Sequence, residues 1–227
     1  MKNDDQFIYV TKQLGDMDKL LIKLMWEKCR GIQIFTSNSF DPATVITRIG
    51  IIDLYKKWVD ETLAIFTRSG YLSFDGETYT VTKHTSIEDT SSWKEWEYRR
   101  EEWLKDDNLK SQVVLVETML GAVPDMLTGN QPATDIMFPQ SSMTLVEGVY
   151  KHNLLADYFN DVLAEKIVAF MQERINQSNV TSKSIRILEI GAGTGGTSAS
   201  VLPRLKPFQE YIEEYCYTDL SLASLRH

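Results

Sequence analysis

The chain has 227 residues, 43% of them hydrophobic and 25% charged, which is the ordinary composition of a globular protein with one large core or two small ones. Its formal net charge of -8 argues against nucleic acid or an anionic membrane as the main partner, because the summed field repels phosphates. No apolar run reaches the length of a membrane span, and the first residues lack the basic and then apolar order of a signal peptide. Cys29 and Cys216 lie in different segments without metal or redox spacing, so they predict reduced thiols in a cytoplasmic protein and no metal site.

The first expected domain covers residues 1–83 and combines helices with a hairpin. Apolar residues at helical spacing predict a helix from Asp16, and Asp41 followed by proline is a typical start for the next helix. A third helix is expected over residues 53–69, followed by a hairpin over residues 71–81 with an Asp-Gly turn. This order indicates a winged-helix-like domain. The basic residues of the region are offset by neighbouring acids, so the sequence predicts a lid or packing role instead of DNA binding.

The second expected domain, residues 84–180, is a helical adaptor. Trp96 and Trp103 lie among alternating charges, which favours packing of both indoles on a core over an aromatic binding patch. Prolines and glycines over residues 121–139 predict a loop that interrupts the helices. From Ser141 onward an apolar stripe at helical spacing leads to the third expected domain, residues 181–227. The stripe comprises Leu145, Val149, Leu154, Leu155, Phe159, Leu163, Ile167, Val168 and Phe170.

The most informative stretch is an apolar strand, expected over residues 185–190, that ends in a glycine-rich turn. Its β character predicts burial on both faces of a parallel sheet, and the glycines allow a sharp turn into a helix whose N-terminal amides hold an anion. Gly191, Gly193 and Gly196 also satisfy the dinucleotide pattern, so the glycines alone do not separate a nicotinamide enzyme from a methyltransferase. Glu189 precedes the first glycine by two residues and gives E-x-G-x-G-x-G, which resembles the first motif of class I S-adenosylmethionine (SAM) methyltransferases.

A second acid follows at the end of the next expected strand. Residues 215–218 form a short aromatic-rich run before Asp219, at a spacing that fits a βαβ unit. A carboxylate at this place accepts the ribose hydroxyls of a nucleoside cofactor, and an acid that caps a helix near Ser221 is the alternative. For Glu189 the alternative is an acid at the surface end of a strand. The predicted cofactor residues of this turn are Glu189, Gly191, Gly193, Gly195 and Asp219.

A longer segment, residues 135–153, resembles the linker that precedes the SAM-binding core in methyltransferase domains of polyketide synthases. In that family the linker is followed by a helix, by the strand and turn described above, and by a helix ending in a Leu-Pro pair, here Leu202-Pro203. The resemblance covers residues 114–227 well and the preceding residues only in architecture. It implies a carbon methyltransferase that moves the methyl group of SAM to the α-carbon of a β-ketoacyl chain on acyl carrier protein. The likeness is greatest to the trans-acyltransferase assembly lines of bacteria.

The fold class that this resemblance implies is a mainly α, winged-helix-like lid and adaptor with a β-hairpin, followed by the start of an α/β, Rossmann-like class I methyltransferase core that is truncated after its second strand. The family's catalytic base is a histidine oriented by an acid, expected beyond residue 227, so the chain alone is expected to be incomplete and inactive. His152 is interpreted as a surface or lid residue, with a role as the base as the alternative. Tyr150 and Phe138 are candidates to line the cofactor or acyl pocket, because an aromatic ring attracts a sulfonium; packing between linker and core is the alternative for both.

Three other functions stay open at this point. A non-catalytic, methyltransferase-like module would dock its neighbours without chemistry. A methyltransferase-like domain of a polyketide loading module would support decarboxylation or repeated methylation with a metal. An O-methyltransferase domain would use the same cofactor on an oxygen. The expected partners are acyl carrier protein with its phosphopantetheine-bound β-ketoacyl chain and neighbouring synthase domains, and neither nucleic acid nor membrane is expected.

Overall fold

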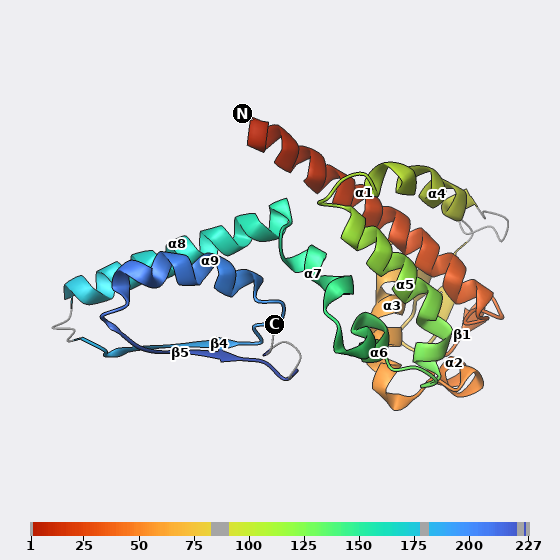
Figure 1. Ribbon diagram of the computed structural model, residues 1–227. Helices are drawn as coiled ribbons and strands as arrows, with labels where there is room; N and C mark the ends of the chain where they lie inside the picture. Colours follow the sequence, from red (N-terminus) through yellow and green to blue (C-terminus); the bar gives the residue numbers. More distant parts are fainter. Residues whose placement is uncertain (1, 83–90, 178–181, 222–224, 226–227) are drawn as a thin grey trace. The chain divides into compact units, whose positions relative to one another are not determined.

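The computed structural model describes residues 2–82, 91–177, 182–221 and 225 (Figure 1). The chain separates into two compact units, one formed by Lys12–Met137 and the other by Met1–Thr11 with Phe138–His227. The division into residues 1–83, 84–180 and 181–227 stays a prediction. Each unit is described below by itself. No helix in the described ranges combines the length and the apolar character that crossing a bilayer requires.

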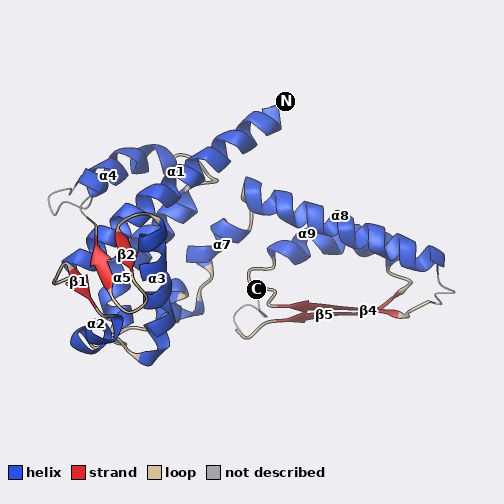
Figure 2. Ribbon diagram, turned by 180° about the vertical axis from the view of Figure 1, so that it is seen from behind, coloured by secondary structure: helices blue, strands red, loops and turns tan. Residues whose placement is uncertain are grey.

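The larger unit consists of helices and a small antiparallel sheet (Figure 2). Its helices are α1 (Lys2–Gly31, which begins in the other unit), α2 (Pro42–Ile49), the short 3-10 helix η1 (Asp53–Tyr55), α3 (Lys56–Arg68), α4 (Ser91–Trp103), α5 (Lys110–Leu127) and α6 (Ala133–Met137). Its strands are β1 (Ser39–Phe40), β2 (Leu72–Phe74) and β3 (Tyr79–Val81), in the order β1-β3-β2.

Local signals account for the first of these elements. The Asp41 carboxylate accepts a hydrogen bond from the Thr44 N–H at 2.8 Å and caps α2, while Gly50 ends it in the left-handed region at φ 76°. The Asp75 side chain accepts hydrogen bonds from the N–H groups of Glu77 and Thr78, which closes the predicted hairpin between β2 and β3. The second and third expected helices and the hairpin are therefore confirmed, whereas the first helix begins at Lys2 and not at the predicted Asp16. Pairing of β1 with β3 adds a third strand that the sequence did not indicate.

Aromatic side chains fill the core of this unit. The ring of Trp26 meets that of Phe66 edge to face at 5.0 Å, and both side chains are buried. Trp96 and Trp103 are also buried, as predicted, and their indole N–H groups donate to Glu117 and Gln13. The indoles of Trp96 and Trp103 thus keep their hydrogen bonds, which avoids the cost of an unpaired donor.

The predicted loop over residues 121–139 is wrong in its first part. Helix α5 continues through Gly121 and Pro124 to Leu127, and α6 occupies part of the remainder. A proline usually interrupts a helix because it lacks the N–H donor. Here the free energy gained by burying one face of α5 in the core outweighs the cost of the hydrogen bond lost at Pro124. The buried side chains of α5 are Val113, Leu120, Val123, Met126 and Leu127.

The smaller unit contains the beginning of an α/β layer. Its elements are η2 (Pro139–Ser141), α7 (Thr144–Tyr150), α8 (Leu154–Gln177), β4 (Ile185–Ile190), α9 (Gly196–Leu205), η3 (Lys206–Phe208) and β5 (Ile212–Thr218). Strands β4 and β5 pair in parallel, and α8 and α9 lie together on one side of them (Figures 1 and 2). The core between helices and strands consists of Ala164, Met171, Ile185, Val201 and Leu205. This is the strand, helix, strand order that the glycine-rich motif predicts.

Two packing expectations for this unit are wrong. Strand β4 is covered on one face only, since Leu188 is 60% and Ile190 81% exposed. Helix α8 buries Ala164 and Met171, whereas Phe159 and Phe170 of the predicted apolar stripe are about as exposed as Leu188. The helical period of α8 is right, but the face that packs against α9 and β4 carries Ala164, Ile167 and Met171 and not the two phenylalanines.

Candidate functional site

The site forms where β4 passes into α9 through the glycine-rich turn. Gly191, Gly193 and Gly195 have φ values of 73°, 58° and 73°, all in the left-handed region that residues with a Cβ rarely adopt. Gly195 is the N-cap of α9. The first amides of a helix have no partner within it, so the start of α9 presents N–H groups at the carboxyl end of β4.

Asp219 lies directly against this turn. One oxygen of its carboxylate accepts a hydrogen bond from the Gly193 N–H at 2.9 Å, and the other accepts one from the Ser221 N–H at 2.7 Å. The Thr218 carbonyl accepts from both Gly191 N–H and Ala192 N–H, at 3.0 and 2.9 Å. The end of β5 and the glycine turn are therefore joined by hydrogen bonds. Asp219 stabilises the turn through the Gly193 N–H and also bonds the backbone two residues further on, at Ser221.

Glu189 lies on the covered face of β4. Its Oε2 atom accepts hydrogen bonds from the Ser198 hydroxyl and the Tyr215 phenol, each at 2.5 Å. Burial raises the pKa of Tyr215 to about 12, and the hydrogen bond to Glu189 acts in the same direction, so the phenol stays a donor at neutral pH. Burial also raises the pKa of Tyr217, whose hydroxyl donates to the Gly193 carbonyl at 3.5 Å.

The segment before the strand forms a wall against the start of α9. A Cβ on Gly196 would lie 2.5 Å from the carbonyl oxygen of Tyr150, closer than such atoms approach. The Thr197 hydroxyl donates to the Asn160 side-chain oxygen at 2.8 Å, and Arg204 pairs with Asp161 at the same distance. Gly196 belongs to the predicted glycine pattern and Tyr150 was a predicted site residue, but Asn160 and the close contact itself were missed, because the contact joins segments far apart in the chain.

The remaining candidates of the linker take different places. The Tyr150 side chain is 57% exposed, although its backbone contacts the turn, and Phe138 is half-buried. His152 is exposed at φ 57° in the break between α7 and α8, where Asn153 accepts a hydrogen bond from the Leu155 N–H and begins α8. The structure thus gathers the five predicted residues of the turn, and brings Tyr150 to it by its main chain.

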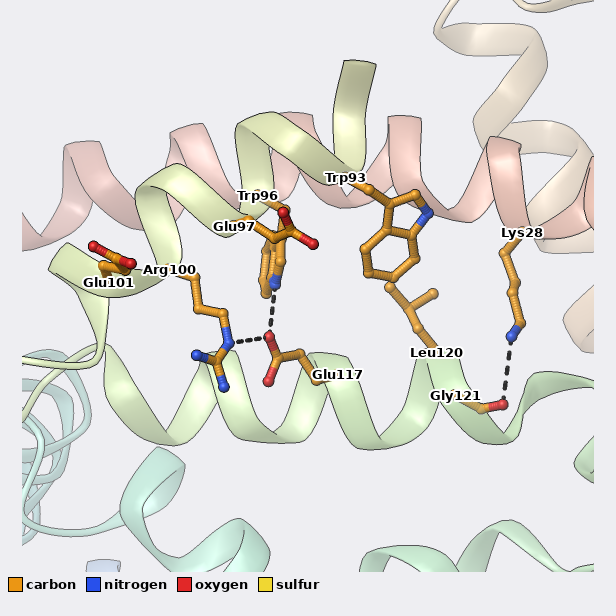
Figure 3. Close-up of a pocket in the computed structure, with 9 residues that line it drawn as sticks. All are labelled: Lys28, Trp93, Trp96, Glu97, Arg100, Glu101, Glu117, Leu120 and Gly121. Carbon is orange, nitrogen blue, oxygen red and sulfur yellow. Dashed lines mark hydrogen bonds and ion pairs between the residues drawn. The ribbon is translucent and has the colours of Figure 1, made fainter. Parts of the chain in front are cut away.

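A separate hollow of about 620 Å³ lies between α1, α4 and α5 of the larger unit (Figure 3). Arg100 and the indole of Trp96 both point toward Glu117, whose Oε1 accepts from them at 2.5 and 2.9 Å. Lys28 donates to the carbonyl of Gly121 at 3.4 Å. Lys28 and Arg100, the two cationic residues that line the hollow, are thus bonded to groups of the protein itself. We therefore interpret the hollow as part of the packing between the helices.

We compared the sequence and the structure with those of known proteins. No protein-family model matches the sequence. Polyketide synthase PksM of Bacillus subtilis (strain 168) is 46% identical over 216 residues, which cover 93% of this chain and 5% of PksM. The solved structure of DszA carbon methyltransferase is 28% identical, with a TM-score of 0.79 over 100% of this chain and 57% of that one. Most of the chain is thus similar to polyketide synthases, and the whole chain is similar to a solved carbon methyltransferase.

The fold is also similar to that of a more distant solved methyltransferase. The trans-methyltransferase CalH, solved as a complex with SAH, has a TM-score of 0.53 and 20% identity over 92% of this chain and 52% of CalH. The chain spans a small fraction of PksM and about half the length of the two solved methyltransferases. The mainly helical structure of the chain is thus similar in fold to solved methyltransferases.

Proposed function

We propose that the chain is the SAM-binding N-terminal part of a polyketide synthase methyltransferase domain. The complete domain would transfer the methyl group of SAM to the α-carbon of a β-ketoacyl chain carried on acyl carrier protein, in the cytoplasm and beside other synthase domains. The observation that carries the proposal is the glycine turn, with three left-handed glycines and an amide bonded to Asp219. The likeness to DszA carbon methyltransferase and to the SAH-bound CalH supports the same cofactor class.

The turn has the groups that the two ends of this cofactor need. The N-terminal amides of α9 suit the carboxylate of an amino-acid moiety, and the Asp219 carboxylate suits a pair of ribose hydroxyls. When bound, SAM supplies an electrophilic methyl group on its sulfonium, which a carbon nucleophile takes while SAH leaves. In this proposal the residues of the chain hold and orient the cofactor, and Tyr150 borders the site. The base that forms the enolate is expected beyond residue 227.

Binding and turnover test the proposal separately. SAH affinity would be measured by calorimetry on the 227-residue chain and on a complete methyltransferase domain that carries this sequence. A β-ketoacyl carrier protein would then be incubated with SAM and analysed by mass spectrometry. We expect the complete domain to bind SAH and to increase the carrier-bound chain by one methylene. Absence of SAH binding by the complete domain would contradict the proposal.

A docking module without chemistry is the second candidate. The observation that favours it is the uncovered face of β4, where Leu188 and Ile190 offer an apolar surface to another polypeptide. A complete domain that binds no SAH, but co-purifies with a neighbouring synthase domain and loses it on Ile190→Lys, would favour this function over the methyltransferase.

A further inference from the structure

Glu189 joins three elements of the smaller unit. Its carboxylate accepts hydrogen bonds from Ser198 on α9 and from Tyr215 on β5, and its own position is on β4. The main chain repeats the link, since the Thr218 hydroxyl donates to the Glu189 carbonyl at 2.7 Å. Glu189 therefore connects β4 to both α9 and β5 by hydrogen bonds.

The two side-chain bonds are of the strong kind. A hydroxyl donating to a carboxylate at 2.5 Å is at the short end for charge-assisted bonds, which are about twice as strong as neutral ones. Both donors meet the same oxygen, Oε2, and Ser198 is only 6% exposed. A carboxylate near the first turn of a helix is also stabilised by the helix dipole. These bonds hold the first turn of α9 at a fixed place against β5.

We propose that Glu189 is a positioning residue for cofactor binding, which fixes the first turn of α9 against β5 and thereby sets the direction of the amides at the N-terminus of α9. The proposal rests on the proposed SAM site and replaces direct contact of Glu189 with the cofactor. Its oxygen Oε2 accepts from side chains of α9 and β5, and Asp219 accepts from backbone amides of the turn and of Ser221. The two acids then have different tasks in one turn.

The two roles make opposite demands on the neighbours of Glu189. If Glu189 acts through α9 and β5, removing either donor has the same kind of effect as removing the carboxylate. If it contacts the cofactor directly, Ser198→Ala and Tyr215→Phe leave affinity unchanged while Glu189→Ala weakens it. The test is calorimetry of SAH binding to the complete methyltransferase domain, with Tyr158→Phe as the matched control because that tyrosine is exposed on α8.

We expect Ser198→Ala and Tyr215→Phe each to weaken SAH binding by about 3- to 10-fold, and Glu189→Ala by about 10- to 100-fold. The double variant Glu189→Ala/Ser198→Ala is expected to bind no worse than Glu189→Ala alone, because coupled groups are not additive. Glu189→Gln, which keeps an acceptor oxygen, is expected to stay within about 3-fold of the parent. Normal affinity in both donor variants, or a Glu189→Gln loss as large as that of Glu189→Ala, would overturn the proposal.

A readout independent of SAH separates this proposal from the proposed function. Amide hydrogen exchange of peptides over residues 191–200 reports the rigidity of the turn with no ligand present. Glu189→Ala is expected to speed exchange there by at least about 10-fold relative to Tyr158→Phe. If the parent domain binds no SAH, the proposed function fails, and this exchange still decides the positioning role: unchanged exchange overturns it.

Discussion

Replacing Gly196 by alanine tests the wall against the glycine turn. Gly196 is the first residue of α9, and the new Cβ would lie 2.5 Å from the Tyr150 carbonyl oxygen and 3.4 Å from the Asn160 side-chain nitrogen. The nearer contact is with backbone, which has no rotamer to change. Either α9 moves away from the linker or the end of α7 shifts, and both movements disturb the turn.

The expected cost follows from two opposing effects. Overpacking a tight contact costs about 1–3 kcal/mol, while replacing glycine in a helix by alanine returns at most about 1 kcal/mol. Because the contact is with backbone, we expect a net loss of about 1–2 kcal/mol. For a chain of this size, that corresponds to a fall in Tm of roughly 2–8 °C. Affinity for SAH should fall by about 10-fold as the amides move.

Thermal unfolding with a matched glycine supplies the measurement. Gly15 lies inside α1, and a Cβ there meets nothing within 4 Å, so Gly15→Ala should stabilise the chain by up to about 1 kcal/mol through helix propensity alone. The two variants carry the same substitution in opposite surroundings. If Gly196→Ala unfolds at or above the temperature of Gly15→Ala, the close approach of Tyr150 to α9 is wrong.

Three further results are expected. Asp219→Ala should weaken SAH binding of the complete domain by about 10- to 100-fold in calorimetry, since a charged acceptor is lost, and an unchanged Kd would show that it holds no part of the cofactor. Burial raises the pKa of Cys29 to about 12, so under native conditions a thiol reagent at mildly alkaline pH should label Cys216 well before Cys29; equal rates would contradict the packing. The folded pKa of Tyr215, about 12, lies above the ordinary value of 10.0 for tyrosine, so its share of stability is full below about pH 10 and is lost as pH rises toward 12. Tyr215→Phe should remove that part of the alkaline loss in pH-dependent denaturant unfolding.

Elements that are determined locally were predictable from the sequence. The start of α2 depends on Asp41 and the amide three residues later, and the hairpin depends on Asp75 and the glycine after it. The glycine turn is local in the same sense, because each glycine is required by its own φ angle. Such features need only neighbours in sequence, and the sequence shows them directly.

Features that depend on distant packing were not predictable in this way. Pro124 is a strong helix breaker by itself, and only the burial of α5 around it explains why the helix continues. The third strand exists because β3 has a free edge that the short segment at Ser39 meets. In both cases the preference of one residue is overridden by contacts made across the fold.

In the site itself, the role of Glu189 could not be predicted from the residues next to it in sequence. E-x-G-x-G-x-G in the sequence identifies a turn but gives its acid no partner, and a strand-end glutamate is equally suited to a ligand or to the surface. The structure supplies Ser198 and Tyr215, one within the following helix and one on the next strand, and their bonds make Glu189 part of the support of the turn. Asp219 bonds the turn itself. An acid in a cofactor motif therefore acquires its role from the donors that the fold brings to it, and mutating those donors distinguishes the roles that the motif leaves open.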